Sequence, residues 1–249
     1  MDIAEKDFNT LYRKFVEYIL NKGANIIVRG KETLECTSCV ITLTNINNDH
    51  LDFTNTQAYQ RQDKYEDYRK REIEWYESGC LVAKHAPAPK FWKGISGRDG
   101  KIQSNYGYLI FHEKKPYKKI KITSYKNVLD ILTKDKFSRQ AILHYNLPLH
   151  YAINKKDIPC TVCTQILIRN GKLNFFVFQR SSDLYLGLPY DMSWHCYLIK
   201  RLVGELKKRN MKIKPGHLTI FIGSAHIYKK DAQSMKNFLI KRKFHAKEK

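Results

Sequence analysis

The sequence predicts a single-domain protein of mixed α/β class, and three observations support this prediction. Residues 7–20 place apolar side chains on one face of a helix, and Gly23 follows as a helix-terminating residue. Residues 161–168 and 173–179 are rich in β-formers, and Asn170-Gly171 between them is the dipeptide that most strongly favours a two-residue hairpin turn. The length of 249 residues suffices for one sizeable core, and nothing in the composition requires a second domain.

Further segments are expected in order along the chain. Residues 25–35 are punctuated by glycine and predict a loop that leads into a strand, and residues 45–59 are polar and irregular. Residues 65–78 predict a second helix that ends at Gly79, whereas the prolines within 85–89 exclude a helix there because proline lacks an N–H and restricts the residue before it. Helices at 124–132 and 194–208, and a strand at 218–222 that continues through 224–228, complete the expected set.

The composition is strongly basic, with 45 Lys and Arg against 24 Asp and Glu and a net charge of +21. Such a charge makes nucleic acid or another polyanion a candidate partner. The basic residues are spread along the chain, and we interpret the clusters at 114–115, 118–119 and 241–243 as solvated surface, so no sequence-specific nucleic-acid binding is expected. No apolar run reaches the length of a membrane span and no secretory signal opens the sequence, which predicts a cytoplasmic protein without a membrane partner.

Six cysteines include two CxxC pairs, Cys36/Cys39 and Cys160/Cys163. Both pairs lie in β-branched, apolar runs, and residues three apart on a strand point to opposite faces. A zinc knuckle needs a turn between its cysteines, and no glycine or proline separates either pair. We therefore expect neither a metal site nor a dithiol redox site.

The predicted hairpin brings a thiol, a guanidinium and a hydroxyl to one end of a ribbon. Its two-residue loop fixes the strand pairing and sets Cys160 opposite Ser181, with Arg180 one position away. A strict ladder puts Cys160 and Arg180 on opposite faces, so they share a pocket only if the ribbon twists or carries a bulge. A nearby cation lowers the pKa of a thiol, which makes Cys160 a candidate nucleophile, and the other two side chains suit a phosphate. The alternative is a buried structural cysteine beside a surface arginine.

The residues around this hairpin resemble a known family. Pro159-Cys160, followed by Gln-Arg-Ser-x-Asp-x-x-Leu-Gly-x-Pro-Tyr at 179–190, is similar to the signature of the thymidylate synthase superfamily. Members that act on uracil carry asparagine after this tyrosine, whereas this chain has Asp191, as cytidylate-directed members such as phage deoxycytidylate hydroxymethylases do. The alternative interpretation is that Asp191 only caps the helix that follows.

The resemblance implies an α/β (α+β), thymidylate synthase-like fold for residues 1–249 as one catalytic domain. In it, helices cover one side of a large twisted mixed β-sheet, and the other side forms a sheet-mediated homodimer. Residues 135–143 resemble the segment whose arginines cross the dimer interface to the neighbouring subunit's nucleotide phosphate. Arg139 matches the first arginine and Gln140 replaces the second, so each active site is expected to be completed by its partner.

The other site residues are likewise implied by the resemblance. Glu72, followed by Trp75 and Tyr76 at the family's spacing, stands where the family has its acid, with Glu74 as the alternative, and Lys31 is the alternative to Arg29 in the phosphate loop. The implied catalytic residues are Cys160, Glu72 and Asp191, and the implied substrate-binding residues are Arg29, Arg139, Arg180, Ser181, Asp183, Gly187, His226, Tyr228, Trp92 and Tyr106.

Several of these residues have a defined role in the family. His226 and Tyr228 match a pair that binds the sugar 3′-hydroxyl, and Asp183 matches a residue that contacts pyrimidine or folate. This chain departs from the family pattern at Ile95, where a second tryptophan is expected, at Thr161, where a histidine is usual, and in the tail 244–249, which lacks the apolar C-terminus with which synthases close over their ligands.

The resemblance implies a one-carbon transferase that converts deoxycytidylate to its 5-hydroxymethyl derivative, with 5,10-methylenetetrahydrofolate as carbon donor. Cys160 adds to C6 of the pyrimidine and so activates C5. A phage-encoded enzyme of this kind acts in the host cytoplasm. Alternatives are C5 methylation of deoxycytidylate or deoxyuridylate and, from another class, a basic nucleic-acid-binding protein that keeps the fold without catalysis.

Overall fold

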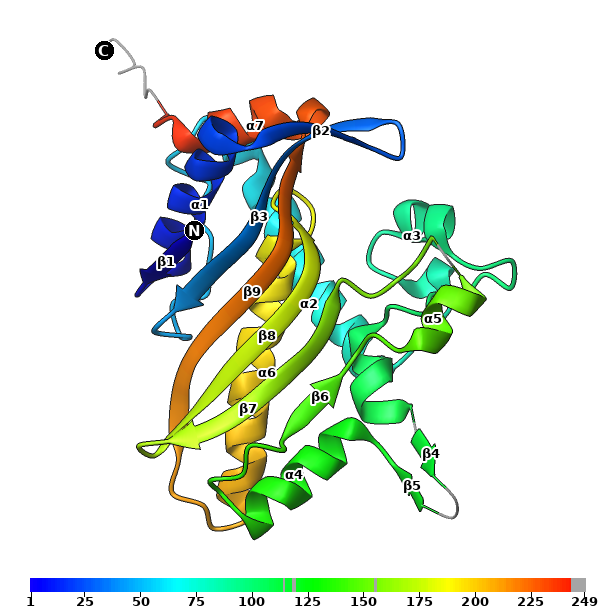
Figure 1. Ribbon diagram of the computed structural model, residues 1–249. Helices are drawn as coiled ribbons and strands as arrows, with labels where there is room; N and C mark the ends of the chain where they lie inside the picture. The colour runs from blue at the N-terminus through cyan, green and yellow to red at the C-terminus, as the bar shows by residue number, and fades with distance from the viewer. Residues whose placement is uncertain (114, 118–119, 155, 243–249) are drawn as a thin grey trace.

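A mixed seven-stranded sheet runs through the molecule (Figure 1). The computed structural model describes residues 1–113, 115–117, 120–154 and 156–242. β1 is parallel to β3 and β8 is parallel to β9, and the other neighbouring strands are antiparallel. In spatial order the strands are β1 (Asp2–Glu5), β3 (Lys31–Leu43), β9 (Lys214–Tyr228), β8 (Lys172–Asp183), β7 (Thr161–Arg169) and β6 (Ile142–His144); β2 (Ala24–Val28) pairs with the start of β3, and β4 (Lys115–Tyr117) pairs with β5 (Ile120–Ile122) in a separate ribbon.

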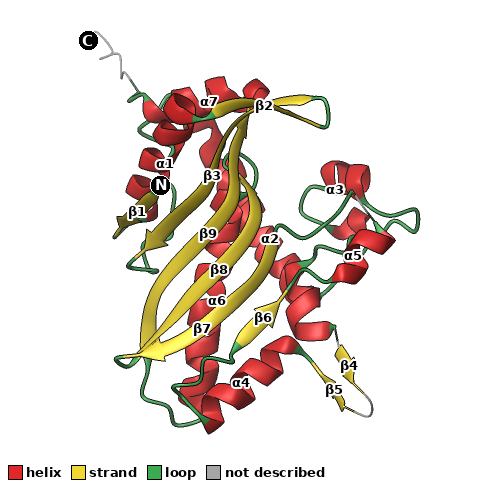
Figure 2. Ribbon diagram, viewed as in Figure 1, coloured by secondary structure: helices red, strands yellow, loops and turns green. Residues whose placement is uncertain are grey.

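Helices cover one face of this sheet. Figure 2 shows α2 and α6 behind the strands, whereas the face toward the viewer carries no helix in the part of the chain that the structure describes. The helices are α1 (Phe8–Lys22), α2 (Gln62–Ser78), α3 (Pro89–Ile95), α4 (Ser124–Lys134), α5 (Pro148–Ile153), α6 (Leu188–Lys208) and α7 (Lys229–Leu239), with short 3₁₀ turns at Tyr59–Arg61 and Ala83–His85 and a π-helical turn at Tyr108–His112. Among the described residues, none of the helices is long and apolar enough to cross a membrane.

The two faces of the sheet differ in what they bury. Val177 and Gln179 of β8 are both buried. They share the helix side of the sheet, because side chains two residues apart on a strand point to the same face. Phe178 points the other way and is 39% exposed, and its ring stacks on Phe221 of β9 with centroids 4.9 Å apart. The uncovered face is therefore partly aromatic, which is a feature of protein interaction surfaces.

Local sequence signals account for the elements predicted best. Asp7 caps α1, since its side chain accepts a hydrogen bond of 2.8 Å from the backbone N–H of Thr10, and Gly23 ends the helix. Asn170 and Gly171 both have positive φ, as a type I′ hairpin turn requires. The predicted first helix and central hairpin are thus confirmed.

Other boundaries differ from prediction. Residues 25–35 form the hairpin of β2 and β3 rather than a loop, because Arg29 and Gly30 both adopt positive φ in the turn. The last strand, β9, runs unbroken from Lys214 to Tyr228. Helix α6 begins at Leu188, before the predicted start at residue 194, because Pro189 in its first turn is compatible with a helix N-terminus.

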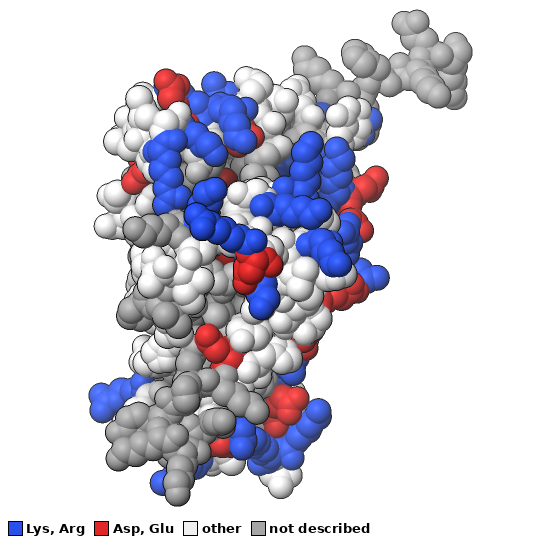
Figure 3. All heavy atoms as spheres, turned by 90° about the vertical axis from the view of Figure 1, so that its right-hand side faces the viewer, with Lys and Arg blue, Asp and Glu red and all other residues white. Residues whose placement is uncertain are grey.

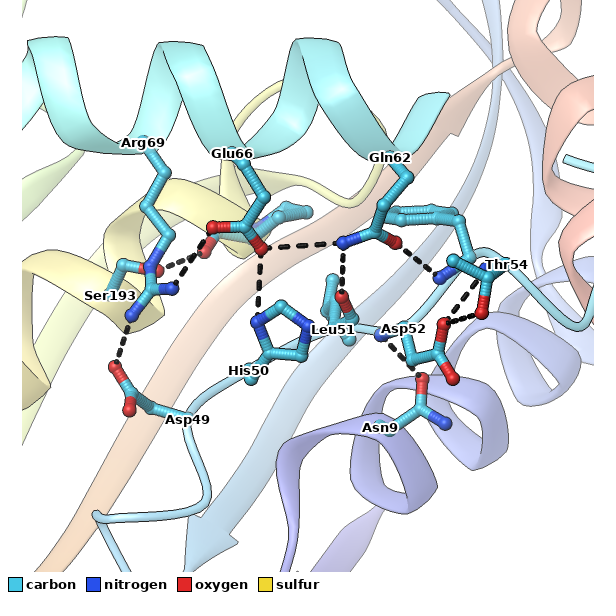
Figure 4. A network of polar contacts seen from close by, with 12 residues as sticks. Asn9, Asp49, His50, Leu51, Asp52, Thr54, Gln62, Glu66, Arg69 and Ser193 are labelled. Atoms are coloured by element: carbon cyan, nitrogen blue, oxygen red, sulfur yellow. Dashed lines mark hydrogen bonds and ion pairs between the residues drawn. The ribbon is translucent and has the colours of Figure 1, made fainter. Parts of the chain in front are cut away.

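The irregular segment 45–58 is held against α2 by side chains (Figure 4). Gln62 accepts a hydrogen bond of 2.7 Å from the backbone N–H of Phe53, and Asp49 pairs with Arg69 at 3.1 Å. The Gln62 side chain gives the Phe53 backbone a hydrogen-bond partner that a strand or helix would otherwise supply, and the Asp49–Arg69 pair attaches the segment to α2.

Some residues named from the sequence lie outside the described part of the chain. They are residues 114, 118 and 119 of the two lysine pairs, residue 243 of the basic cluster near the end, and the whole tail 244–249.

Candidate active site

A β-bulge organises the end of the hairpin that carries Cys160. Cys163 pairs with Phe178 in the predicted register, but Thr161 pairs with Gln179, so the register shifts by one residue at Val162. Arg180, rather than Ser181 as predicted, therefore lies opposite Cys160. The backbone N–H of Arg180 donates to the Cys160 carbonyl at 2.9 Å. The bulge thus brings the thiol and the guanidinium to the same side of the ribbon.

The Cys160 thiol lies between a guanidinium and a hydroxyl. Its Sγ is 3.7 Å from Nη2 of Arg180 and 3.7 Å from Oγ of Ser181. Arg180 also holds the chain just before the cysteine, because Nε donates to the Pro159 carbonyl at 3.1 Å and Nη2 to the Ile158 carbonyl at 2.7 Å. The three residues that the sequence grouped are therefore together in the structure.

Burial controls the charge of the thiol. Removal of Cys160 from water raises its pKa, and the positive charge of Arg180 opposes this effect without cancelling it. The negative charge of Asp191 raises the pKa further. The resting group is therefore a thiol, although the sequence emphasised the lowering effect of a neighbouring cation.

Two carboxyls, the buried Glu72 and the partly buried Asp191, lie on the helix side of the sheet. Asp191, in the first turn of α6, accepts a hydrogen bond of 2.9 Å from Nε2 of Gln179, and burial raises its pKa to about 7. Burial, together with the charge of Asp191, raises the pKa of Glu72 on α2 to about 8. Glu72 also accepts a hydrogen bond of 3.2 Å from the hydroxyl of Tyr68. Near neutral pH both acids can hold and release a proton.

The structure decides two alternatives left open by the sequence. The residue at the N-cap of α6 is Gly187, and Asp191 lies within the helix with its carboxylate on Gln179, so the capping interpretation of Asp191 is wrong. Glu74 is exposed, whereas Glu72 is 7% exposed and near enough to Asp191 for the two charges to interact. Of the two acids, Glu72 is therefore the one whose position suits the candidate site, and its role stays a prediction.

Tyr106 and Trp92 lie behind the site rather than on its surface. The Tyr106 hydroxyl accepts a hydrogen bond of 3.1 Å from the backbone N–H of Thr161, next to Cys160, and its ring stacks on Tyr76. The Trp92 indole donates to the Tyr68 hydroxyl at 3.3 Å. The two residues are 5% and 8% exposed respectively, and their predicted contact with substrate stays a prediction.

The other predicted ligands gather where β8 and β9 end. Asp183 pairs in register with His226, and its Oδ1 accepts the backbone N–H of Tyr185 at 2.8 Å. The rings of His226 and Tyr228 are perpendicular, with centroids 5.3 Å apart. Gly187 closes the turn after β8 through a bond from its N–H to the Asp183 carbonyl.

Arg29 and Lys31 approach this end of the sheet from the β2–β3 hairpin. The Lys31 ammonium lies over the Tyr228 ring, 5.8 Å from its centroid. Burial raises the pKa of Tyr228, while the charge of Arg29 lowers it, which places the Arg29 charge near the site. The choice between these two residues as phosphate ligand stays a prediction.

Arg139 does not reach the site of its own subunit. It is exposed in the loop after α4, and its carbonyl accepts a hydrogen bond of 3.0 Å from the side chain of Gln165. Gln165 lies five residues along β7 from Cys160, a separation of about 16 Å on a strand. Arg139 belongs to a site only if that site is on a neighbouring molecule.

Sequence reasoning missed a hollow and several supporting residues. A hollow of about 410 Å³ opens beside Arg180 and is also lined by Asn146, Leu147, Tyr151 and Val162. Gln179, which donates a hydrogen bond to Asp191, lies within the motif at 179–190. Strand alternation, which puts Gln179 on the buried side of β8, was the signal that could have identified its role. No local pattern indicated Tyr68 or the four lining residues, because they come from segments distant in sequence.

Comparison with known proteins shows the family of this chain. Residues 10–248 match the family model described as Thymidylate synthase, and the chain therefore belongs to the thymidylate synthase family. Membership makes it a one-carbon transferase acting on a nucleotide. The chain is similar to the Deoxycytidylate 5-hydroxymethyltransferases of Enterobacteria phages T4 and T2, with 33% identity over 171 residues that cover 66% of this chain and 67% of each phage protein. It is also similar to the Thymidylate synthase of Clostridium beijerinckii, with 27% identity over 148 residues, which are 59% of this chain and 50% of that protein.

Proposed function

We propose that this protein transfers a hydroxymethyl group to C5 of deoxycytidylate, using methylenetetrahydrofolate as carbon donor. The observation that carries the proposal is a carboxyl, Asp191, held by Gln179 beside Cys160 at the position where uracil-directed members have an amide. Similarity to phage proteins named for the same reaction supports it.

Cys160 is the proposed nucleophile. Its sulfur forms a bond to C6 of the pyrimidine as the C5=C6 double bond opens, and the electrons of that bond let C5 bond to the incoming carbon. Loss of the C5 proton and cleavage of the S–C6 bond restore the double bond and free the cysteine. Because burial raises the pKa of the resting thiol, the proton must leave as the nucleotide binds. Arg180, 3.7 Å from the sulfur, stabilises the thiolate that results.

Asp191 is the proposed reader of the base. Cytosine presents an acceptor at N3 and donors at N4. A protonated carboxyl donates to N3 and accepts from N4, and an ionised carboxyl does the same for a cytosine protonated at N3. The pKa of about 7 allows either arrangement near neutral pH. Protonation at N3 also withdraws electrons from the ring and favours attack at C6.

The nucleotide phosphate and sugar have separate proposed partners. Arg180 and Ser181 hold the phosphate, together with Arg29 or Lys31 and with Arg139 from a second subunit of a homodimer. His226 and Tyr228 hold the sugar hydroxyl, and Asp183 contacts the pyrimidine or the folate.

The residues near Glu72 fit a flat cosubstrate. The ring centroids of Tyr68 and Tyr190 are 4.5 Å apart, and the Trp92 indole is bonded to Tyr68, so an aromatic surface adjoins the acid. The folate would supply one carbon at the oxidation level of formaldehyde. Glu72 orients the water that adds to this carbon and takes up or returns the proton.

The product mass tests the proposal. After incubation with deoxycytidylate and methylenetetrahydrofolate, we expect the nucleotide to gain CH₂O. A gain of CH₂ would mean methylation instead, and a product formed only from deoxyuridylate would contradict the cytosine assignment.

The high positive charge favours one competing function, polyanion binding without catalysis. Figure 3 shows Lys and Arg side chains over much of one face, with acidic side chains among them. Binding that depends on these charges falls steeply with salt. Nucleic-acid affinity that collapses between low and moderate salt, in a protein without turnover, would favour this competing function.

A further inference from the structure

We propose that Asp157 is a positioning residue that fixes the location of the Cys160 sulfur. The proposal rests on the proposed function only in that Cys160 is taken as the nucleophile. Asp157 is three residues before Cys160, is 3% exposed and is not part of the site described above.

The Asp157 carboxylate is bound to a neighbouring segment by three donors. Oδ2 accepts the backbone N–H of Gln103 at 2.6 Å and that of Ser104 at 3.1 Å, and Oδ1 accepts the Ser104 hydroxyl. The Gln103 side chain completes the junction, because its Nε2 donates to the carbonyls of Asn154 and Asp157. A buried carboxylate with this many partners is held in one orientation.

The same neighbouring segment holds the chain again just after the cysteine. Tyr106, two residues beyond Ser104, accepts the backbone N–H of Thr161 at 3.1 Å. Cys160 therefore lies between two anchors, Asp157 and Thr161, that are attached to one short stretch, 103–106. Loss of either anchor leaves the nucleophile free to move relative to the nucleotide.

Arg180 cannot replace these anchors during the reaction. In the structure it bonds the carbonyls of Ile158 and Pro159, but it is also the proposed ligand of the nucleotide phosphate. A guanidinium that turns toward a phosphate weakens its other bonds. Asp157 and Tyr106 keep the cysteine in place whichever partner Arg180 takes.

Two substitutions separate position from charge. Asp157→Asn removes the charge but keeps the bonds, because the amide oxygen accepts both N–H groups and the amide nitrogen donates to Ser104, whose hydroxyl can also accept. Asp157→Leu removes all three bonds. The matched control is Asp49→Leu, which removes a different buried aspartate, 6% exposed and paired with Arg69 and Lys200.

The measurements are kcat and KM for deoxycytidylate and the rate at which iodoacetamide alkylates Cys160, followed by peptide mass. We expect Asp157→Leu to lower kcat by about 100-fold, as a misplacement of about 1 Å does, with KM changed by less than about threefold. The alkylation rate should change with it. Asp157→Asn should stay within about threefold of the wild type in kcat, and the Asp49→Leu control should lose stability without a comparable loss of kcat.

Two results would overturn the proposal: equal impairment in Asp157→Asn and Asp157→Leu, or an equal loss of kcat in Asp49→Leu at matched stability. If Asp157→Leu does not fold, Ser104→Ala removes one of the three bonds, and an unchanged kcat and alkylation rate there would count against the proposal. A wild type without turnover of deoxycytidylate would contradict the proposed function alone, since alkylation still compares the variants.

Discussion

At the scale of single residues, the first chemical requirement is that the thiol of Cys160 loses its proton. Its pKa is raised by burial, so a resting thiol must become a thiolate only when substrate is present. We expect Cys160→Ser to abolish turnover while nucleotide binding survives, because the hydroxyl fits the same space but is rarely ionised near neutral pH. Steady-state kinetics and equilibrium binding of deoxycytidylate measure the two properties.

Cys163 provides the matched control. Cys163 lies on β7, two residues after Thr161 and just past the bulge at Val162. Burial raises its pKa, as it does that of Cys160. Cys163→Ser should retain activity. Normal turnover in the Cys160 variant, or equal loss in both variants, would exclude the covalent mechanism.

The choice of base is the second chemical requirement, and we expect Asp191 to determine it. Asp191→Asn exchanges the carboxyl for an amide whose oxygen accepts the N3 proton of uracil and whose nitrogen donates to O4. A mismatched base leaves buried polar groups unpaired at a cost of about 1–3 kcal/mol each. We expect the ratio of kcat/KM for cytidine over uridine nucleotides to fall by about tenfold or more, since about 1.4 kcal/mol is a factor of ten. Proportional loss on both bases would make Asp191 a structural residue.

The raised pKa values of Glu72 and Asp191 also make stability depend on pH. Both acids bind protons more tightly when folded, so their contribution is fully present below their ordinary values of 4.5 and 3.8 and is lost as pH rises through about 8 and 7. We expect the free energy of unfolding in urea to fall as pH rises from about 4 to about 8, by at most about 1.4 kcal/mol per pH unit for each group, and to level off above that range. Glu72→Gln should flatten this fall, and an unchanged slope would contradict the assignment.

At the scale of elements, the hairpin shows how far local sequence signals reach. Asn170-Gly171 correctly predicted the turn and the register as far as Cys163, because turn geometry and strand alternation are local properties. The bulge at Val162 was not predicted, because it depends on β6 and the segment after it: the backbone N–H groups of Tyr145 and Asn146 both donate to the Val162 carbonyl.

Gly107, just before the π-helical turn, packs closely against α2, so we expect a larger residue there to be destabilising. A Cβ at this position would lie 1.7 Å from the backbone oxygen of Tyr76, which cannot move without moving the helix. We expect Gly107→Ala to destabilise the protein by about 3 kcal/mol or more in urea unfolding, as severe overpacking does. Because Tyr106 is the adjacent residue, activity should fall as well.

Gly204 is the control for this substitution. It lies within α6, and a Cβ there would meet no atom within 4 Å. Gly204→Ala should stabilise the protein by about 0.5–1 kcal/mol through helix propensity. A Gly107→Ala variant as stable as Gly204→Ala would show that the α2 contact is looser than the structure indicates.

At the scale of the whole molecule, the sequence predicted the helix-covered α/β sheet through its family resemblance, and the grouping of Cys160, Arg180 and Ser181 through the hairpin turn, which is a local signal. It could not place Glu72 beside Asp191, or Asp157 beside Ser104, because those contacts join distant segments. The partly aromatic, helix-free face of the sheet supports the homodimer that the resemblance implies.

The position of Arg139 leads to the last prediction. Arg139 lies beside Gln165 in the middle of β7, and Cys160 precedes the first residue of this strand. A two-fold axis that crosses β7 between these two positions in a face-to-face dimer would bring Arg139 of each subunit toward Cys160 of the other. Arg139→Ala and Cys160→Ser should each be inactive alone. Mixed together, they form dimers in which one site receives both an intact cysteine and an intact arginine. With random exchange half of the dimers are mixed, so activity should recover to about one quarter of the wild-type value. Exchange is verified with subunits that carry different mass labels, and activity that stays at zero after verified exchange would contradict a site shared between subunits.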